Sequence, residues 1–599
     1  MEVSQDDPSW GDDTGALQPA ASRPPGLESL RRIGSRPGVQ HAAVLVSYCL
    51  LSLALFGAKV VHDFGSRFIA RLPMDASIFI WSLRWWPYAL AHHLDPLYTK
   101  LVWAPGGINL AWTTTPPVPS LLLTPITLWF GPIAAFNVLT LLGPAVSAWT
   151  AYLLCRRVTH APLASIVGGL AFGFSVAVLY QLGQGHPNFF LAPMIPLAAY
   201  EVVRYLEGSL SARAFVALFG VTILVQFGIS TEVTATMTVF AGVAWVLGFA
   251  FAGRAWRVRL ARVAELMALA YAGAVILLIP WLYVAFRDPR PIFRLGGDAT
   301  LTRPWTMLSK AVLPSNTIVA GSIRPLESSN FGSDLYIGVP LLLILIHLVV
   351  TQWRNPAVRA LAITFVLVFA SAFGAGVTIG GHTFPTPFRI LHALPLLHLA
   401  LPDRLLTYCA LIAAVGLAAW LALGRREWWR LGLALVAIVT ALPNLGISPV
   451  VATVPSTPFF STGEYRTVLS PGAAVLIDQP VSGWQARVRQ GYTMLWQAKS
   501  GMYYTLAGGW FGSATPPSAE VQMIRSLDMN TSYRKDRAAI SELIHRLGVT
   551  SILVIDQPPG AIRRLCRFLA TPAVTVDHVV LFRSPFGMHN VGAARVGCA

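Results

Sequence analysis

One aspartate, Asp75, stands where a charged side chain could do chemistry. It lies in RLPMDASIFIW, shortly after the first long apolar stretch of the chain. Ionisable residues at a membrane face are costly, so each is a candidate for function. A partly desolvated carboxylate there could take a proton from a hydroxyl group. Asp75 could instead cap the following helix, because aspartate often accepts hydrogen bonds from the first N–H groups of a helix.

Two arginines are candidates for binding an anionic group beside this carboxylate. Arg404, in LPDRLL, begins an apolar stretch, and Arg389, in TPFRIL, precedes it in the same connection. The planar guanidinium group matches the oxygens of a phosphate. Either arginine could also be an anchor at the end of a membrane span, with its stem in the apolar layer and its charge in water. Asp403 is adjacent to Arg404 and could pair with it.

Three further polar residues belong to two short turns between apolar stretches. His186 and Asn188 lie in GQGHPN, and Glu232 lies in ISTEV. We expect both turns on the same side of the membrane as Asp75, where facing helices could close a cavity above it. Each turn also has a simpler interpretation. His186 could bond to backbone within its turn, and Glu232 could be an acid stabilised by the dipole of a helix N-terminus.

The residues His92, His93 and Asp95, in AHHLDP, suggest a metal site. Adjacent histidines point to different sides of a helix, which separates two of the three side chains. We therefore assign no metal ligands. A divalent metal is possible as a cofactor but is not indicated by the sequence.

The composition is that of a membrane protein. The 599 residues are 55% hydrophobic and 12% charged, with a mean hydropathy of +0.59, whereas soluble domains carry about 25% charged residues. Apolar stretches of about 17 to 25 residues recur from Ala42 to Val450, each long enough to cross a bilayer. The net charge of +17 does not indicate nucleic acid, because the arginines concentrate in short connections, as positive-inside topology requires.

The basic connections set the expected topology. Those at 254–262, 354–359 and 425–430 are expected inside, which gives eleven spans, a cytoplasmic N-terminus and an extracytoplasmic C-terminus. The segment 119–131 is short and is interrupted by Pro125, so we interpret it as an interfacial or re-entrant half-helix. The expected spans are near residues 42–61, 133–154, 163–180, 188–205, 212–230, 233–251, 263–286, 335–351, 359–378, 404–423 and 431–450.

Three outer segments, 62–132, 287–334 and 379–403, are too long to be simple connections and are expected to carry the function. The first contains ASIFIWSLRWWPYALAHHL, in which Trp81 and Trp85 lie on one side at helical spacing. We expect an amphipathic helix on the membrane surface there, with tryptophan at headgroup depth.

The two ends of the chain differ from its apolar middle. Residues 1–38 are rich in Pro, Gly, Ser and Asp and are expected to be a disordered cytoplasmic tail, whereas 39–450 form the transmembrane domain. Residues 451–599 have the composition of an α/β domain, which could support the protein, recognise an acceptor or only cap it. Cys566 and Cys598 fall in this domain and could form a disulfide. Strands are expected at 473–480, 551–559 and 578–585, with a helix at 534–549.

These features together resemble one enzyme superfamily. An N-terminal anchor, a long first outer loop that opens with an aspartate, many further spans and a C-terminal outer domain are similar to GT-C glycosyltransferases, which use polyprenyl-phosphate sugars. The segments MDASIFIWSLRWWPYAL, WAPGGINLAWTTTPPVPSLLLTPITLWFGPIAAFN and FGFSVAVLYQLGQGHPNFFLAPMIPL resemble uncharacterised bacterial members, and the resemblance covers most of residues 42–450. It implies a polytopic α-helical membrane fold with about eleven transmembrane helices and a small C-terminal α/β domain.

The resemblance also implies a function. The chain would transfer a sugar from a polyprenyl-phosphate donor to an extracytoplasmic glycan, lipid or protein. Asp75 matches by position the aspartate that acts as base in the family. Ala76 follows it where many members have a second acidic residue, which leaves a metal requirement open. Arg404 or Arg389 would bind the phosphate, and the three polar turn residues would bind the sugar or the acceptor.

Two other function classes stay open at this point. A lipid or solute transporter or flippase would need polar residues near the bilayer midplane and often has internal repeats, whereas the polar residues here concentrate at the outer rim. A non-catalytic cell-envelope assembly protein would use Asp75 only as a cap. Arginines outnumber lysines 39 to 5 (44 minus 5), which hints at a GC-rich bacterial genome and hence at the bacterial plasma membrane.

Overall fold

A computed structural model describes most of the chain, which divides into residues 1–47 and a main unit, residues 48–599. The expected N-terminal tail falls almost entirely outside the described residues, as does most of the expected outer loop 287–334. The described residues are 37–71, 73–287, 302–312, 335–394, 397–424, 427–442, 451–455, 457–478, 485–512 and 537–586.

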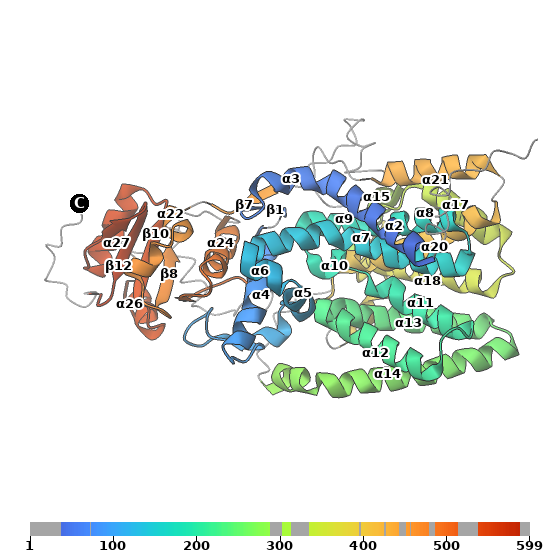
Figure 1. Cartoon of the computed structure of the whole chain (residues 1–599), viewed down its shortest axis with the longest axis horizontal. Helices are drawn as coiled ribbons and strands as arrows, with labels where there is room; N and C mark the ends of the chain where they lie inside the picture. The colour runs from blue at the N-terminus through green and yellow to red at the C-terminus, as the bar shows by residue number, and fades with distance from the viewer. Residues whose placement is uncertain are drawn as a thin grey trace, which may run out of the picture. The chain divides into compact units, whose positions relative to one another are not determined.

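Apolar helices dominate the described residues (Figure 1). Eight of them are long and apolar enough to cross a membrane: Gly38–Asp63, α7 (Pro132–Thr159), Pro162–Gln184, Pro187–Leu206, α12 (Ala212–Ile229), α13 (Thr231–Phe251), α14 (Arg254–Arg287) and Pro402–Leu423. Three shorter apolar helices, α17 (Val339–Thr351), α18 (Pro356–Ala372) and α21 (Trp428–Ala441), match the other three expected spans. The expected polytopic helical architecture is therefore confirmed.

Two of the expected spans are broken near the turn that joins them. The first consists of α8 (Pro162–Gly173) and α9 (Val176–Gln184), and the side chain of Ser175 caps α9. The second consists of α10 (Pro187–Phe190) and α11 (Met194–Leu206), with a proline directly before α11. At the first break the N–H of Val178 donates to Oγ of Ser175, and at the second the N–H of Ala192 donates to Oγ of Ser147 on α7 at 3.0 Å. The short helices α9 and α10 flank the turn that contains His186.

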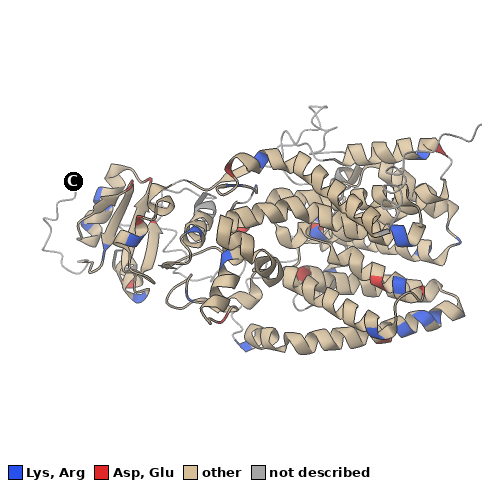
Figure 2. Ribbon diagram, viewed as in Figure 1, with Lys and Arg blue, Asp and Glu red and all other residues tan. Residues whose placement is uncertain are grey.

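Charged residues are sparse along the spans and gather near their ends (Figure 2). The basic connection 254–262 forms the first turns of α14, whose remaining length is almost free of charge. Arg157, at the end of α7, pairs with Glu207 at 2.5 Å. This distribution is typical of helices whose middles contact hydrocarbon and whose ends reach water.

The helix that contains Asp75, α4 (Pro73–Ala91), is buried and does not lie on a membrane surface as expected. Trp81 and Trp85 are almost fully buried within it. The helix α24 (Gln485–Lys499) packs against α4, and α7 packs against it as well. The apolar residues of α4 therefore belong to a protein core, and the expected surface helix is wrong because its partner lies far along the chain.

The expected half-helix at 119–131 forms two short helices, α5 (Pro117–Leu122) and α6 (Thr124–Phe130). They meet at Leu123, and α6 has a proline as its second residue, which suits the first turn of a helix. The side chains of Trp129 and Phe130 at the end of α6 are exposed. Neither helix is long enough to span a bilayer.

The C-terminal region contains a five-stranded sheet in the order β11-β12-β10-β8-β9. The strands are β8 (Ala474–Asp478), β9 (Thr505–Leu506), β10 (Ser551–Ile555), β11 (Val574–Val576) and β12 (Val579–Arg583). β10 is parallel to β8, with Leu553 opposite Ile477, and antiparallel to β12. The helices α26 (Arg537–Arg546) and α27 (Pro559–Leu569) flank β10 in the chain. The expected α/β composition of this region is confirmed. Cys566 on α27 is disulfide-bonded, and Cys598 lies outside the described residues.

The C-terminal region shares a hydrophobic core with the first outer loop. The strand β1 (Arg67–Ile69), just before α4, pairs antiparallel with β7 (Val451–Thr453). A single cluster of buried residues contains Trp81 of α4 together with Leu553 and Phe582 of the sheet. The segment before α4, α4 itself and the sheet therefore support one another.

Candidate active site

Asp75 lies in the first turn of α4, and two side chains contact its carboxylate. Nε2 of His186 is 3.3 Å from Oδ2 of Asp75. The Nε1–H group of Trp510 donates to Oδ1 of Asp75 at 3.1 Å. The Asp75 side chain is only 25% exposed. Because α4 begins at Pro73, Asp75 is not the cap of this helix, although the first turn is also favourable for a negative charge.

His186 reaches Asp75 because a glycine lets its turn approach α4 closely. Gly185, with φ at +83°, ends α9, and a Cβ atom there would lie 2.7 Å from the Cβ of Ala70 and 2.9 Å from that of Ala76. Nδ1 of His186 is 3.0 Å from Oε1 of Gln181. The ring of His186 therefore contacts side chains on both edges, which differs from the simple turn interpretation of the sequence.

This arrangement identifies the group that is free to accept a proton. Both ring nitrogens of His186 have partners. Each oxygen of Asp75 has one side-chain contact and a second lone pair, since a carboxylate has about four acceptor positions. Asp75, rather than His186, can therefore accept a hydrogen bond from a further hydroxyl group.

The surroundings of Asp75 favour its ionised form. Burial alone would raise the pKa of Asp75, but the hydrogen bond and charge of His186, the Trp510 N–H group and the charge of Arg404 together hold this pKa below its ordinary value. Desolvation favours the protonated form of this carboxylate, but the nearby donors and charges outweigh it. The group is charged at neutral pH and only weakly basic.

Trp510 is the contact that the sequence did not reveal. It follows two glycines in AGGWF, and Gly509 has φ at +151°, which other residues rarely adopt. The backbone N–H group of Trp510 lies 3.1 Å from Sδ of Met494 on α24. The Gly-Gly-Trp sequence indicates a turn that requires glycine. The partner of Trp510, Asp75, lies 435 residues earlier in the chain, which no local sequence pattern can show.

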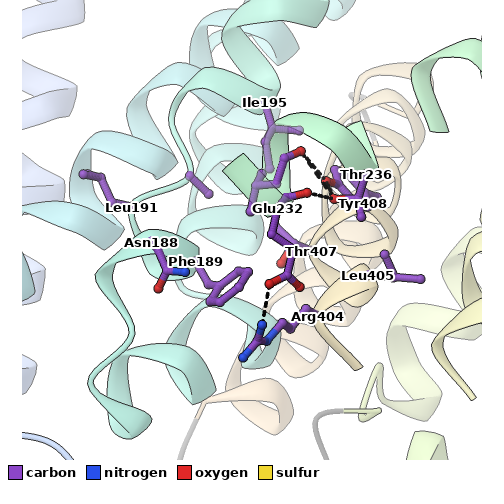
Figure 3. A pocket seen from close by; sticks show the side chains of 12 residues that line it. Asn188, Phe189, Leu191, Ile195, Glu232, Thr236, Arg404, Leu405, Thr407 and Tyr408 are labelled. Atoms are coloured by element: carbon purple, nitrogen blue, oxygen red, sulfur yellow. Dashed lines mark hydrogen bonds and ion pairs between the residues drawn. The ribbon is translucent and has the colours of Figure 1, made fainter. Parts of the chain in front are cut away.

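A second polar group is formed by Arg404 and Glu232 (Figure 3). Nη1 of Arg404, in the helical turn Pro402–Leu405, donates to Oε2 of Glu232 at 2.5 Å, and both side chains are 19% exposed. The guanidinium group also lies over the ring of Phe189, 4.2 Å from its centroid. Oδ1 of Asp403 lies 3.8 Å from Nη2 of Arg303, whereas Arg404, the next residue in the chain, pairs with Glu232.

The ion pair lines a small cavity of about 10 Å³, which is room for about one water molecule. Oδ1 of Asn188, a residue only 3% exposed, has no hydrogen-bond partner among the described residues, and Thr236 is hydrogen-bonded to Tyr408 at 2.6 Å. The cavity is lined by Asn188, Phe189, Leu191, Ala192, Ile195, Glu232, Val233, Thr236, Arg404, Leu405, Thr407 and Tyr408. A sugar phosphate would have to separate these side chains to enter.

The remaining candidates lie apart from these two groups. Arg389 is exposed on α19 (Phe388–Ala393) and is not among the residues that line the cavity. Nδ1 of His92 is 2.8 Å from the carbonyl oxygen of Tyr88, and His92 and His93 are both exposed. Within the described part of the chain, no group of three or more His, Cys, Asp or Glu residues is arranged to hold a metal ion.

Solved structures resemble this chain, whereas no family model and no curated protein matches it. The arabinofuranosyltransferase AftD from Mycobacteria has a TM-score of 0.54 at 14% identity, over 91% of this chain and 40% of AftD. The oligosaccharyltransferase AglB from Archaeoglobus fulgidus has 0.46 at 13% identity, over 91% and 74% of the two chains. ArnT from Cupriavidus metallidurans, bound to undecaprenyl phosphate, has 0.46 at 11% identity, over 90% and 97%.

The likeness concerns the fold, because the sequence identities are low. The comparison of folds depends on AftD, which has the highest TM-score of the three structures described above. This chain spans about 40% of the length of AftD. With its many apolar helices, the chain is a multi-pass membrane protein. The polytopic helical fold expected from the sequence is confirmed, and this fold is similar to that of AftD.

Proposed function

We propose that this chain is a membrane glycosyltransferase that moves a sugar from a polyprenyl-phosphate donor to a hydroxyl group outside the cytoplasm. The observation that carries the proposal is the charged carboxylate of Asp75, which His186 and Trp510 contact while acceptor positions stay open. A GT-C fold shared with AftD, an arabinofuranosyltransferase, supports it. The acceptor is a glycan, a lipid or a protein of the cell envelope.

In the proposed reaction, Asp75 takes the proton of the acceptor hydroxyl. The acceptor oxygen forms a bond to the anomeric carbon while the bond between that carbon and the phosphate oxygen breaks, and the polyprenyl phosphate leaves with the electron pair. The new bond forms on the face opposite the leaving group, so the configuration inverts. A weakly basic carboxylate is sufficient because the hydroxyl becomes acidic as its oxygen bonds to carbon.

Arg404 is the proposed contact for the phosphate of the donor. One of its N–H groups donates to Glu232, and a guanidinium group has five donors in all. Glu232 would thus hold the arginine in place while its other donors face the phosphate. The charge of Arg404 also helps to lower the pKa of Asp75, which supports a phosphate site near the proposed base. Asn188 would contact the sugar or acceptor, and Arg389 is a second proposed phosphate contact.

A transporter is less well supported. Such a protein would need polar groups deep in the spans, and Glu201 on α11 is a buried acid there. Its Oε1 accepts a hydrogen bond from the hydroxyl group of Thr222 on α12 at 2.8 Å. A polar contact of this kind commonly joins two membrane helices, so it does not by itself indicate a transport path.

The proposed location is the bacterial plasma membrane, with the N-terminus in the cytoplasm and the C-terminal domain outside. The arginine-rich connections 254–262 and 354–359 support this orientation. It would place Asp75 and Arg404 in the outer leaflet region, where a lipid-linked donor presents its sugar. Membrane lipids, the donor and an extracytoplasmic acceptor are the proposed partners.

The test is label transfer from radiolabelled polyprenyl-phosphate sugars to a cell-envelope extract by purified protein. We expect wild type to label a glycan, lipid or protein fraction with at least one donor. Asp75→Asn should transfer about 10²- to 10⁴-fold more slowly, the usual contribution of a general base. Asp95→Asn is the matched control, because Asp95 is in the same loop and its carboxylate accepts a hydrogen bond from the backbone N–H of Leu97.

Two outcomes would contradict the proposal. One is that wild type transfers label from none of the donors tried, and the other is that Asp75→Asn transfers as fast as wild type. A folded Asp75→Asn protein is recognised by its elution as a single species in detergent. Reduced transfer by Asp95→Asn would show that the loop, rather than the base, had been damaged.

A further inference from the structure

A residue of the C-terminal region, Trp510, contacts Asp75, which lies in the segment 62–132. We propose that Trp510 is a positioning residue for Asp75, and that residues 501–512 complete the active site. The catalytic part of this inference rests on the proposed function, whereas the contact between the two residues does not. From the sequence, residues 451–599 were expected to support the protein, to recognise an acceptor or only to cap it. A contribution of this region to the active site differs from all three expectations.

Backbone hydrogen bonds fix the segment that carries Trp510 to the first outer loop. Leu506 N donates to Leu101 O at 2.8 Å, and Ala104 N donates to Leu506 O at 3.0 Å. Trp103 N donates to Gly508 O at 3.4 Å. The chain directly before Trp510 therefore has a defined position relative to the loop that contains Asp75. Such backbone pairs leave little freedom for the tryptophan to move away.

Gln497 on α24 joins the same parts through its side chain and is fully buried. Its Oε1 accepts from Nε1–H of Trp81 on α4 at 2.8 Å. Its Nε2 group donates to Leu101 O at 2.7 Å and to Tyr504 O at 2.8 Å. One amide thus satisfies groups on α4, on the outer loop and on the segment before Trp510. A buried, fully satisfied network of this kind favours a single arrangement of its parts.

The helices α4 and α24 approach each other closely next to Asp75. A Cβ atom on Gly491 of α24 would lie 2.7 Å from Oγ of Ser77 and 2.8 Å from Cα of Met74. Met74 directly precedes Asp75, so only a glycine permits this approach. The position of the C-terminal helix α24 is therefore set by the turn that presents the carboxylate.

The chemistry of the indole suits a positioning role. Its Nε1–H group is a donor only, so Trp510 cannot take the proton from an acceptor. It holds Oδ1 while His186 contacts Oδ2, and the two contacts together restrict rotation of the carboxylate. The ring of Phe511, next in the chain, packs edge-on against Trp81 with 5.5 Å between centroids, which supports this geometry.

The contact is tested without any sugar donor. Protein labelled with 5-fluorotryptophan gives one ¹⁹F resonance for Trp510, identified by its loss in Trp510→Phe. We expect this resonance to shift in Asp75→Asn, which removes the charged acceptor, and to stay in place in Asp95→Asn. An unchanged Trp510 resonance in Asp75→Asn would overturn the inference.

The role in catalysis is tested by the pH dependence of transfer. Trp510→Phe keeps an aromatic ring but removes the N–H group, so the pKa of Asp75 should rise and the acid limb of the rate profile should move to higher pH. We expect kcat to fall about tenfold, as for loss of a hydrogen bond to a charged group. The donor KM should change less than kcat, since the contact is to the base.

Trp85→Phe is the matched control. Trp85 is buried on α4, the helix that contains Asp75, but its indole N–H group donates to the backbone oxygen of Pro96 and does not contact Asp75 in the described contacts. This variant should leave the acid limb unmoved even if it lowers stability. A Trp510→Phe protein with wild-type rate and wild-type acid limb would overturn the positioning role. If wild type transfers no sugar, the proposed function fails, whereas the ¹⁹F result still decides the contact.

Discussion

Two carboxylates of the candidate site, Asp75 and Glu232, have opposite surroundings. Glu232 is bound directly by Arg404 at 2.5 Å, so its charge is balanced within the pair. Asp75 instead has His186 and Trp510 as neighbours, and Arg404 acts on it only through its charge. The difference separates two tasks. Asp75 keeps a negative charge with acceptor positions open, whereas Glu232 orients a cation.

The two groups also differ in how the chain builds them. Glu232 and Arg404 begin neighbouring helical segments, and both lie at the ends of spans. The Asp75 group needs α4, the turn after α9 and a segment of the C-terminal region. The first group therefore depends on the packing of membrane helices, and the second depends on the docking of the C-terminal region.

The largest expected effect is a difference in kcat between variants of Asp75 and of Glu232. Asp75→Asn should lower kcat by about 10²- to 10⁴-fold, because it removes the base but keeps the shape. Glu232→Gln should lower kcat by less than about tenfold, because the amide oxygen still accepts from Arg404. Transfer rates of the two purified variants at saturating donor check this. A larger loss for Glu232→Gln would reverse the assignment of the two tasks.

The next effect concerns stability. Arg404→Ala leaves Glu232 poorly exposed and without its cation, which costs about 3 kcal/mol for a buried pair broken on one side. Thermal unfolding in detergent should show a clear drop in Tm. The double variant Arg404→Ala with Glu232→Ala should be more stable than Arg404→Ala alone, since no charge is left unpaired. If the double variant is the less stable, the pair is not coupled as described.

A smaller effect tests the close approach of α24 to α4. Gly491→Ala places a methyl group within 2.8 Å of Met74 and Ser77, which should cost about 1 to 3 kcal/mol by overpacking. Transfer should fall as well, because the turn that presents Asp75 is displaced. Gly242→Ala on α13 is the control, since a Cβ atom there would meet no atom within 4 Å. Equal behaviour of the two variants in unfolding and transfer would contradict this packing.

The smallest expected effect is a shift with pH. The contacts of His186 help to lower the pKa of Asp75, so His186→Ala should move the acid limb of kcat/KM to higher pH. A carboxylate whose pKa is lower in the folded state than in the unfolded state stabilises the folded protein at pH values above its unfolded-state pKa, near 3.9. This contribution to the free energy of unfolding is lost as the pH falls through the folded-state pKa. The stability gap between wild type and His186→Ala should therefore narrow below about pH 4. A gap that widens there would contradict the sign.

Much of the fold could be predicted because the bilayer imposes it. A span needs about 20 apolar residues, so stretches such as 212–230 and 233–251 are visible in the sequence and correspond to α12 and α13. Breaks within spans were missed at Ser175 and before α11, because a single cap or proline decides them locally. The strand expected at 473–480 corresponds to β8, Ala474–Asp478.

The candidate site could be predicted only where its residues lie near span ends. The outer turn of His186 follows from the arrangement of spans, and so does its place on the side of Asp75. The burial of α4 could not be predicted, because Trp81 meets Gln497 across 416 residues. Trp510 was missed for the same reason, since tertiary contacts of this range leave no periodic pattern in the sequence.

The most direct test of the central claim, that Asp75 is the base of a sugar transfer, is chemical rescue. Asp75→Ala should transfer label at least about 100-fold more slowly than wild type. Added formate, a small carboxylate that can enter the vacated space, should raise that rate in proportion to its concentration and leave wild type and Asp95→Ala unchanged. An Asp75→Ala protein that transfers sugar at close to the wild-type rate without formate would contradict the claim.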